Sequence, residues 1–191
     1  MKQHLEIILD IGCGKEKHLE ATGIDASDLP GVDIVANIND GIPIRDNLVD
    51  LIYLHHILEH VDDIIKTIEE LYRITNSRGL LDIKCPHFSC GYVAWGDPTH
   101  KRTFTTQTLN YFNPEIAHRA YYSKAKFKVL SVKLNFEAYG GERKKRRGIR
   151  RIMKWFGPFF EYLASINMSL CERIWAQWVG FEEVHFVLKR L

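Results

Sequence analysis

The sequence contains no long apolar run and few cysteines. No uncharged apolar stretch approaches the ~20 residues that a membrane-spanning helix needs. The four cysteines form no Cys-x-x-Cys pair, which argues against a disulfide framework and against compact zinc motifs. Near the N-terminus, Glu6 and Asp10 interrupt the apolar run that an export signal would require. We therefore expect a cytoplasmic protein with reduced thiols.

The sequence also carries little net charge. Its 26 basic and 24 acidic residues give a formal charge of +2, which argues against a nucleic-acid partner because such surfaces carry a marked basic excess. The basic residues gather locally in Arg143–Arg151, and the aromatic segment Trp155–Phe160 follows. Basic residues beside aromatic ones are able to dock on an anionic membrane. Residues 143–160 are therefore a candidate for peripheral membrane contact, with a solvated loop as the alternative.

Five short apolar segments alternate with polar and helical segments in the first half of the chain. They are Glu6–Leu9, Thr22–Ile24, Asp33–Ala36, Val49–Leu54 and Leu80–Cys85. Short runs that are apolar on both faces favour the strands of a buried parallel sheet. Apolar residues at helical spacing predict a helix over Ile57–Ile74, and Gly79 is then expected to make the left-handed turn before the fifth strand.

Two later strands are expected to close the sheet as an antiparallel hairpin at one edge. They are Phe127–Tyr139 and Phe181–Leu188. Residues 86–126 are aromatic and polar, and we interpret them as a long excursion with one helix near Gln107–Phe112. In the first of these strands, alternation predicts one face made of Phe127, Val129, Ser131, Lys133 and Asn135. The order of elements predicts an α/β fold, a doubly wound, mostly parallel sheet with a C-terminal antiparallel hairpin.

A glycine loop, Asp10-Ile11-Gly12-Cys13-Gly14, follows the first of these segments. Glycines after a strand allow a ligand to approach the backbone closely and expose its N–H groups. The second segment ends at Asp25, whose carboxylate is able to accept both hydroxyls of a ribose. A dinucleotide fingerprint requires a third glycine, where Lys17 stands, and an acid ~20 residues beyond the glycines. An NAD or FAD enzyme is therefore disfavoured.

Four segments together resemble the type-11 branch of the class I, Rossmann-like methyltransferases. They are Leu9–Gly14, Gly23–Asp25, Asp50–Ile52 and His56–His60, within a resemblance that spans about residues 5–112 and, more loosely, the last two strands. The resemblance implies methyl transfer with S-adenosylmethionine as the cofactor. It assigns the methionine part to Asp10, Gly12 and Gly14, the ribose to Asp25, the adenine to Asn37 and Ile38, and the pocket wall to His55 and His56.

On this interpretation residues 1–191 form a single methyltransferase domain. Residues 1–85 bind the cofactor, residues 86–126 form the substrate loops, and residues 127–191 supply the closing strands with the basic and aromatic insertion. The chain departs from the family in its short glycine loop, since Gly23 follows Gly14 too closely for a full helix between them. This departure leaves open a domain that binds S-adenosylmethionine without catalysis.

The excursion contains Asp97-Pro98-Thr99-His100-Lys101-Arg102, where the family builds its substrate pocket. The ring of Trp95, the carboxylate of Asp97 and the imidazole of His100 suit a hydroxyl-bearing acceptor, either a small molecule or a glycan. A hydroxyl acceptor calls for a general base, and a neutral histidine is suited to that role. The catalytic candidates are His56, His87, His100 and Asp97. The alternative is an ordinary Asp-Pro turn.

The segment His56-Ile57-Leu58-Glu59-His60 also matches the His-x-x-Glu-His pattern of a group of zinc peptidases. That chemistry requires a helix at the motif and a third ligand, whereas here the motif directly follows a strand. The competing interpretation is a helix start, with Glu59 near the positive end of the helix dipole. Cys85, His87, Cys90 and His100 match no compact zinc motif. We therefore expect no metal site.

Overall fold

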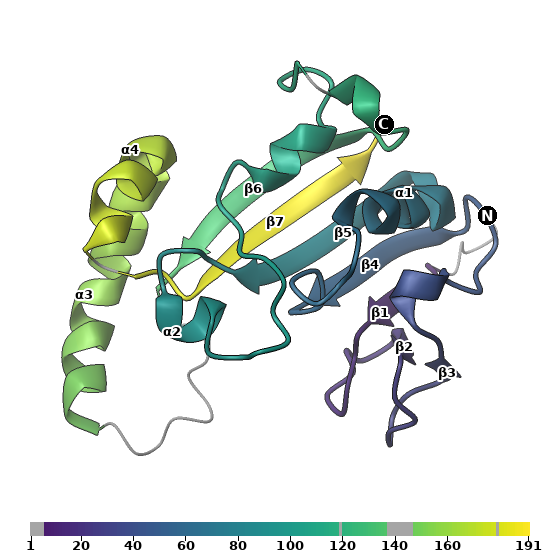
Figure 1. The fold of residues 1–191 in the computed structure, drawn as a ribbon, viewed down its shortest axis with the longest axis horizontal. Helices are drawn as coiled ribbons and strands as arrows, with labels where there is room; N and C mark the ends of the chain where they lie inside the picture. Colours follow the sequence, from purple (N-terminus) through teal and green to yellow (C-terminus); the bar gives the residue numbers. More distant parts are fainter. Residues whose placement is uncertain (1–5, 119, 137–146, 179) are drawn as a thin grey trace.

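The computed structural model describes residues 6–118, 120–136, 147–178 and 180–191. Its strands form one seven-stranded sheet in the order β3-β2-β1-β4-β5-β7-β6 (Figure 1). The parallel strands are β1 (Ile8–Ile11), β2 (Thr22–Asp25), β3 (Ile34–Val35), β4 (Val49–His55) and β5 (Thr75–Pro86). Strand β7 (Glu183–Arg190) runs antiparallel between β5 and β6 (Phe127–Asn135). The Rossmann-like, mostly parallel sheet with an antiparallel C-terminal pair is confirmed.

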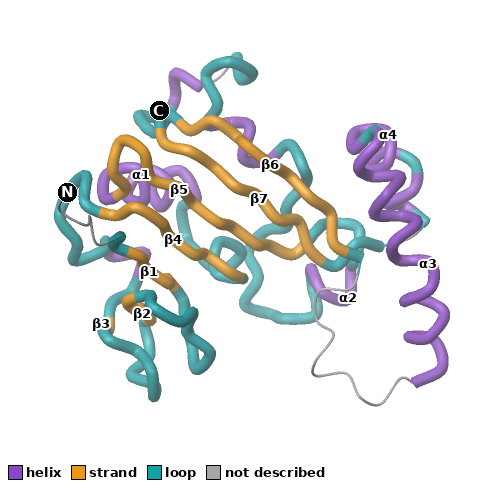
Figure 2. Tube along the Cα trace, turned by 180° about the vertical axis from the view of Figure 1, so that it is seen from behind, coloured by secondary structure: helices purple, strands orange, loops and turns teal. Residues whose placement is uncertain are grey.

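The α-helices are α1 (Ile64–Ile74), α2 (Gly91–Ala94), α3 (Arg147–Ile166) and α4 (Met168–Arg173). Short 3-10 turns form η1 (Ile38–Asp40), η2 (Thr108–Phe112), η3 (Ala120–Tyr122) and η4 (Trp175–Gln177). Helix α1 and the excursion that contains η2 cover one face of the sheet (Figure 1). Figure 2 shows the opposite face of β4, β5, β7 and β6, with no helix of the described residues in front of it. The short β1–β2 and β2–β3 connections contain only turns and bends.

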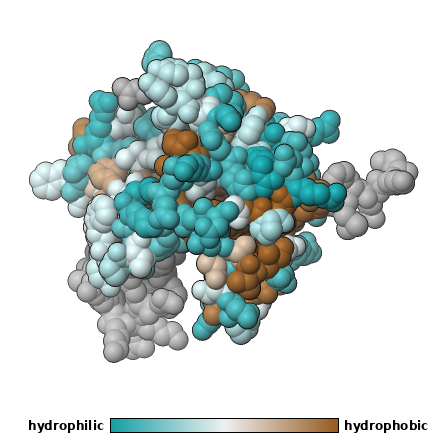
Figure 3. All heavy atoms as spheres, turned by 45° about the vertical axis from the view of Figure 1, so that its right-hand side comes forward, coloured by the Kyte–Doolittle hydropathy of each residue, from teal (hydrophilic) through white to brown (hydrophobic). Residues whose placement is uncertain are grey.

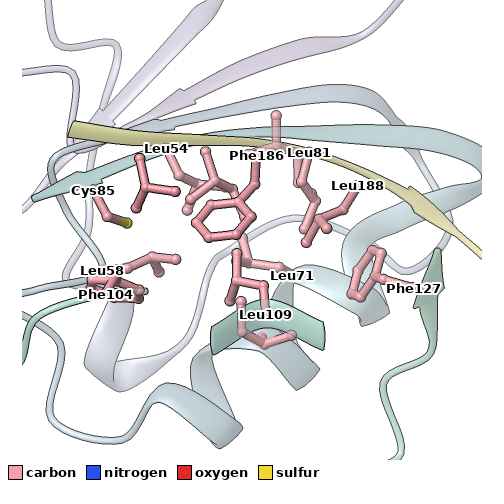
Figure 4. Packing of buried hydrophobic residues seen from close by; sticks show 14 of the residues in the cluster. Leu54, Leu58, Leu71, Leu81, Cys85, Phe104, Leu109, Phe127, Phe186 and Leu188 are labelled. Atoms are coloured by element: carbon pink, nitrogen blue, oxygen red, sulfur yellow. The ribbon is translucent and has the colours of Figure 1, made fainter. Parts of the chain in front are cut away.

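The hydrophobic core lies between the sheet and the covered side. Alternate side chains of β4, β5 and β7 point into it, and Leu71 of α1 and Leu109 of η2 pack against them (Figure 4). Fully buried residues of these three strands include Ile52, Leu54, Leu81, Ile83, Phe186 and Leu188. Since each such side chain stabilises the fold by about 1.5–3 kcal/mol, this layer organises the sheet.

Helix α1 begins at Ile64, later than the sequence pattern predicts. Asp63 caps it, because its Oδ1 accepts the backbone N–H groups of Ile65 and Lys66 at 2.9 and 3.1 Å. Residues 57–63 contain a turn rather than helix. Val61 in this stretch is nevertheless buried, so the apolar residues Ile57 and Val61 imitated a helical stripe.

Two further expectations on the strands are wrong. Gly79 lies inside β5 rather than in a left-handed turn, and a Cβ there would lie 2.7 Å from the carbonyl oxygen of Val49. In β6, a register shift between Val129 and Ser131 reverses the faces of the remaining strand. Lys133 is therefore exposed although it was expected to share a face with the buried Phe127. Residues 137–139 of the expected strand lie outside the described residues.

The C-terminal helices stand at one end of the sheet, where α3 contacts β6 (Figure 1). Residues 143–146 of the basic run lie outside the described residues, and α3 begins within the rest of that run. Within the described ranges, no helix is both long enough and apolar enough to cross a membrane.

Candidate active site

A cavity of about 210 Å³ lies at the carboxyl ends of β1, β2 and β3. Gly12, Asp25, Asn37 and Ile38 line it, all from the expected set, and Ile57, His60 and Val61 add a wall from the turn after β4. The surface on this side of the molecule exposes apolar side chains next to polar ones (Figure 3). In open α/β sheets, ligands bind at this edge.

The glycine loop has the backbone conformation that its glycines permit. Gly12 and Gly14 have φ values of +73° and +54°, in the left-handed region where a Cβ is disfavoured. A Cβ on Gly12 would also lie 2.8 Å from the side chain of Ile57. The loop therefore curls towards the end of β2, where Gly14 donates its N–H to Asp25 at 2.9 Å.

Asp25 is held by two backbone hydrogen bonds at the cavity. Its Oδ2 accepts from Gly14 and its Oδ1 accepts from the N–H of Ser27, both at 2.9 Å. Each carboxylate oxygen has a second lone pair, so both are able to accept a further hydroxyl. Asn37 lies farther along the cavity and accepts the N–H of Asn39 at 3.0 Å. A fixed carboxylate and an amide between apolar walls fit the ribose and adenine of S-adenosylmethionine.

Four of the expected cofactor residues do not line this cavity, namely Asp10, Gly14, His55 and His56. Asp10 is 3% exposed, and its Oδ2 accepts the N–H of His18 at 2.8 Å, so it shapes the loop from within. The ring of His55 lies 2.9 Å from Asp82 and 3.1 Å from His18. Successive side chains of a strand point to opposite faces, and His55 follows Leu54 of the core. Its ring therefore lies on the open face of the sheet.

His56 pairs with two carboxylates. Its Nε2 lies 2.9 Å from Glu183 and its Nδ1 lies 3.4 Å from Glu59. Burial by itself lowers the pKa of His56, but its hydrogen bond with Glu183 and its ion pair with Glu59 outweigh burial and raise the pKa to about 9. Because the imidazole is protonated at neutral pH, His56 is a poor general base.

His87 is 0% exposed, and each nitrogen of its ring contacts another side chain. Its Nδ1 lies 2.7 Å from Ser89, and its Nε2 lies 2.9 Å from Glu172 of α4. Both ring nitrogens are therefore engaged inside the protein. These contacts join the excursion to α4 and argue against a role for His87 as a base.

The segment from Asp97 to Arg102 meets the turn after β4. Asp97 Oδ1 accepts both the N–H and the hydroxyl of Thr99, at 2.8 and 2.6 Å, which is the expected turn. The same hydroxyl lies 2.9 Å from Nδ1 of His60. The His100 ring stands edge-on to that of His60, with centroids 4.8 Å apart. A wall of the cofactor cavity and the expected acceptor segment are therefore in contact.

Arg102 fastens the two segments together. Its guanidinium donates to the carbonyl oxygens of Leu58, Val61 and Asp62 at 3.0, 2.6 and 3.0 Å. The backbone N–H of Lys101 also donates to the carbonyl of Glu59 at 2.8 Å. Hydrogen bonds from residues about forty positions further along the chain therefore hold the turn in place.

The zinc-peptidase alternative is wrong. Residues 58–60 form a turn and not a helix, and His56 binds Glu183 rather than facing a metal with His60. Sequence reasoning also missed the position of His60 at the cavity, since it took His60 and Glu59 for a helix start. Only the contact with Thr99 would have revealed it, and that contact has no local signal.

Comparisons with known proteins agree with this arrangement. A family model described as "Methyltransferase domain" matches residues 3–139. No protein with a curated description is significantly similar in sequence. The chain resembles a SAM-dependent methyltransferase of Archaeoglobus fulgidus (18% identity, TM-score 0.58, 97% of this chain and 86% of that one). It also resembles one of Mesorhizobium loti (14% identity, TM-score 0.54, 96% and 90%). These two likenesses concern the fold.

The family match covers well over half of the chain, so the chain belongs to the methyltransferase family. It is a class I methyltransferase that depends on S-adenosylmethionine, as the glycine loop and the acid after β2 predict.

Proposed function

We propose that this methyltransferase transfers a methyl group from S-adenosylmethionine to a hydroxyl of a polar small molecule or glycan. One observation carries the proposal: His60 lines the cofactor cavity and also contacts Thr99 of the polar Asp97–Arg102 segment. An acceptor on that segment would therefore lie beside the cofactor. Trp95 is exposed just before the segment, and its ring suits stacking on a sugar.

S-adenosylmethionine supplies a methyl group on a sulfonium that is already strongly electrophilic, so the protein mainly aligns donor and acceptor. Asp25 and Asn37 orient the nucleoside end of the cofactor. Asp97 fixes Thr99, which in turn fixes His60. The imidazoles of His60 and His100 each bind a neighbour through Nδ1, which leaves Nε2 to face an acceptor proton or a cation.

Release of S-adenosylhomocysteine with a panel of sugars and amines tests this proposal. We expect turnover with hydroxyl acceptors and at least a tenfold loss in His100→Ala, with the affinity for S-adenosylmethionine nearly unchanged. Tyr121→Ala, on the distant η3, is the control. Turnover with amines alone would overturn the hydroxyl assignment. Cofactor binding without release in any acceptor mixture or cell extract would favour the non-catalytic alternative.

We also propose that residues 143–160 and the helices beyond them contact an anionic membrane surface. The observation in favour is an exposed apolar face on α3, α4 and η4, which follows the basic run. Its members are Phe156, Phe159, Tyr162, Ile166, Leu170, Ile174, Trp175 and Trp178. Exposed apolar groups of this extent mark interaction surfaces, and basic residues favour anionic lipid.

A further inference from the structure

Glu59 is a buried carboxylate that lacks a hydrogen-bond partner. Its side chain is 0% exposed, and neither Oε1 nor Oε2 has such a partner among the described residues. The imidazole of His56 forms an ion pair with Glu59, and its Nδ1 lies 3.4 Å from Oε1. A buried carboxylate without hydrogen bonds is costly unless a cation or further donors compensate it. His56 lies beside Oε1, and Oε2 has no hydrogen-bond donor among the described residues.

Two imidazoles converge on the same place. Glu59, His60 and His100 each contribute one ligand atom, and these atoms all lie within 4.8 Å of one another. Ligand atoms of a tetrahedral zinc ion lie roughly 3.4 Å apart, given bonds of ~2.1 Å. Glu59 and His60 come from the turn after β4, and His100 comes from the segment that Arg102 fastens to it.

The hydrogen bonds set the tautomer of both imidazoles. His100 Nδ1 lies 2.9 Å from the carbonyl oxygen of Ala94, so it carries the proton and donates it. The only hydroxyl proton of Thr99 points to Asp97, so Thr99 accepts from Nδ1 of His60. Each Nε2 therefore has a free lone pair. Metal-binding histidines are held in this way, with the second nitrogen donating to a carbonyl or a carboxylate-linked group.

We propose that Glu59, His60 and His100 bind a divalent transition-metal ion, with Zn²⁺ as the best fit. Two imidazole nitrogens and one carboxylate oxygen are a donor set that zinc uses, with a fourth position left open. The sequence led us to expect no metal. That expectation considered His56 with His60, and His100 only with Cys85, His87 and Cys90, whereas the structure brings His100 to Glu59 and His60 from about forty residues later. The ion would compensate Glu59 and join the turn to the acceptor segment.

Zinc content and zinc binding of the full chain test this proposal. The protein is prepared without a histidine tag, stripped with a chelator, and titrated with Zn²⁺ alone by calorimetry. We expect one Zn²⁺ per chain, with at least a tenfold weaker affinity in Glu59→Gln and in His100→Gln. His118→Gln, which changes an exposed histidine elsewhere, should bind like the wild type. Replacing Zn²⁺ by Co²⁺ should give the visible absorption of a tetrahedral site, lost in His100→Gln.

Binding well below one Zn²⁺ per chain in the wild type would overturn the proposal. Equal affinity in wild type and His100→Gln would do so as well, because the metal would then lie elsewhere. Circular dichroism identifies a variant that fails to fold. In that case the Co²⁺ spectrum of the wild type tests the proposal, and the absence of tetrahedral absorption would overturn it. These readouts do not require methyl transfer. A protein that binds zinc but shows no turnover with hydroxyl acceptors would contradict the proposed acceptor, while the proposed metal site would still stand.

Discussion

At the scale of single residues, Asp25 is placed to decide cofactor affinity. Its two backbone hydrogen bonds keep the carboxylate at the cavity, and ribose hydroxyls would add charge-assisted bonds of ~1.5–3 kcal/mol. We predict that Asp25→Ala weakens S-adenosylmethionine binding by roughly tenfold to a hundredfold. Calorimetry measures this, with Asp28→Ala, an exposed acid on the same loop, as the control. An unchanged dissociation constant in folded Asp25→Ala would remove Asp25 from the site.

A second residue-scale prediction concerns acid stability. Burial tends to raise the pKa of Glu172, but hydrogen bonds from His87 and Thr106 outweigh it and hold the pKa below its usual value. A carboxyl group with a lowered pKa stabilises the fold above the unfolded pKa of about 4.3, and the stabilisation is lost as the pH falls through the folded pKa.

Glu172→Gln should therefore be less stable than the wild type at pH 7, by about 1–3 kcal/mol, because it gives up charge-assisted bonds in a buried place. The difference should shrink as the pH falls below about 4. Urea denaturation at several pH values measures both. A gap that stays constant down to pH 3 would show that the charge of Glu172 contributes nothing.

Single residues also show what a sequence reveals of a site. Gly12, Gly14 and Asp25 could be predicted because they follow strands directly, and parallel strands bring their carboxyl ends to one edge. His60 and Glu59 could not, because their environment is made by Thr99 and His100, which come from a distant segment. His55 and His56 are neighbours in sequence but face different partners, since strand alternation separates them.

At the scale of elements, the side chain of Arg102 contributes most to holding the turn after β4. The guanidinium of Arg102 supplies three hydrogen bonds to backbone carbonyls of that turn. We predict that Arg102→Ala lowers the free energy of unfolding by roughly 2–3 kcal/mol, the range for bonds to charged groups. Urea denaturation provides the measurement.

Lys101→Ala is the matched control for Arg102→Ala. The Lys101 ammonium pairs with Asp62, but both side chains are largely exposed, so this ion pair should contribute little. The two variants remove one positive charge each from adjacent positions. Equal losses in both would mean that charge, and not the bonds to the carbonyls, holds the turn.

The elements that the sequence patterns misjudged are determined by contacts with distant parts of the chain. The start of α1 was placed too early because the buried turn before it has apolar residues at helical spacing, while the true cap is Asp63. The face of β6 reversed at a register shift, which depends on pairing with β7 and not on the composition of β6. Short apolar strands such as β4 were predicted well, since a short apolar run is a local sequence signal.

At the scale of the whole molecule, the exposed face of α3, α4 and η4 predicts membrane affinity. The protein should sediment with vesicles that contain phosphatidylserine and much less with pure phosphatidylcholine vesicles. Tyr162→Ser combined with Trp178→Ser, which removes side chains 63% and 84% exposed, should reduce this binding several-fold. Tyr121→Ser changes an exposed aromatic residue far from α3 in the sequence and should leave vesicle binding unchanged. Equal binding to both lipids would refute an electrostatic contribution.

The contact between His60 and Thr99 ties events in the cavity to events on the neighbouring segment. Free energies of binding at two coupled places are reciprocal, so each ligand changes the affinity for the other by the same factor. If the acceptor binds the Asp97–Arg102 segment as proposed, the factor by which it changes the affinity for the methyl donor equals the factor by which the donor changes the affinity for the acceptor. Different acceptors would then change the affinity for the methyl donor by different factors, which binding measurements detect before any methyl group is transferred.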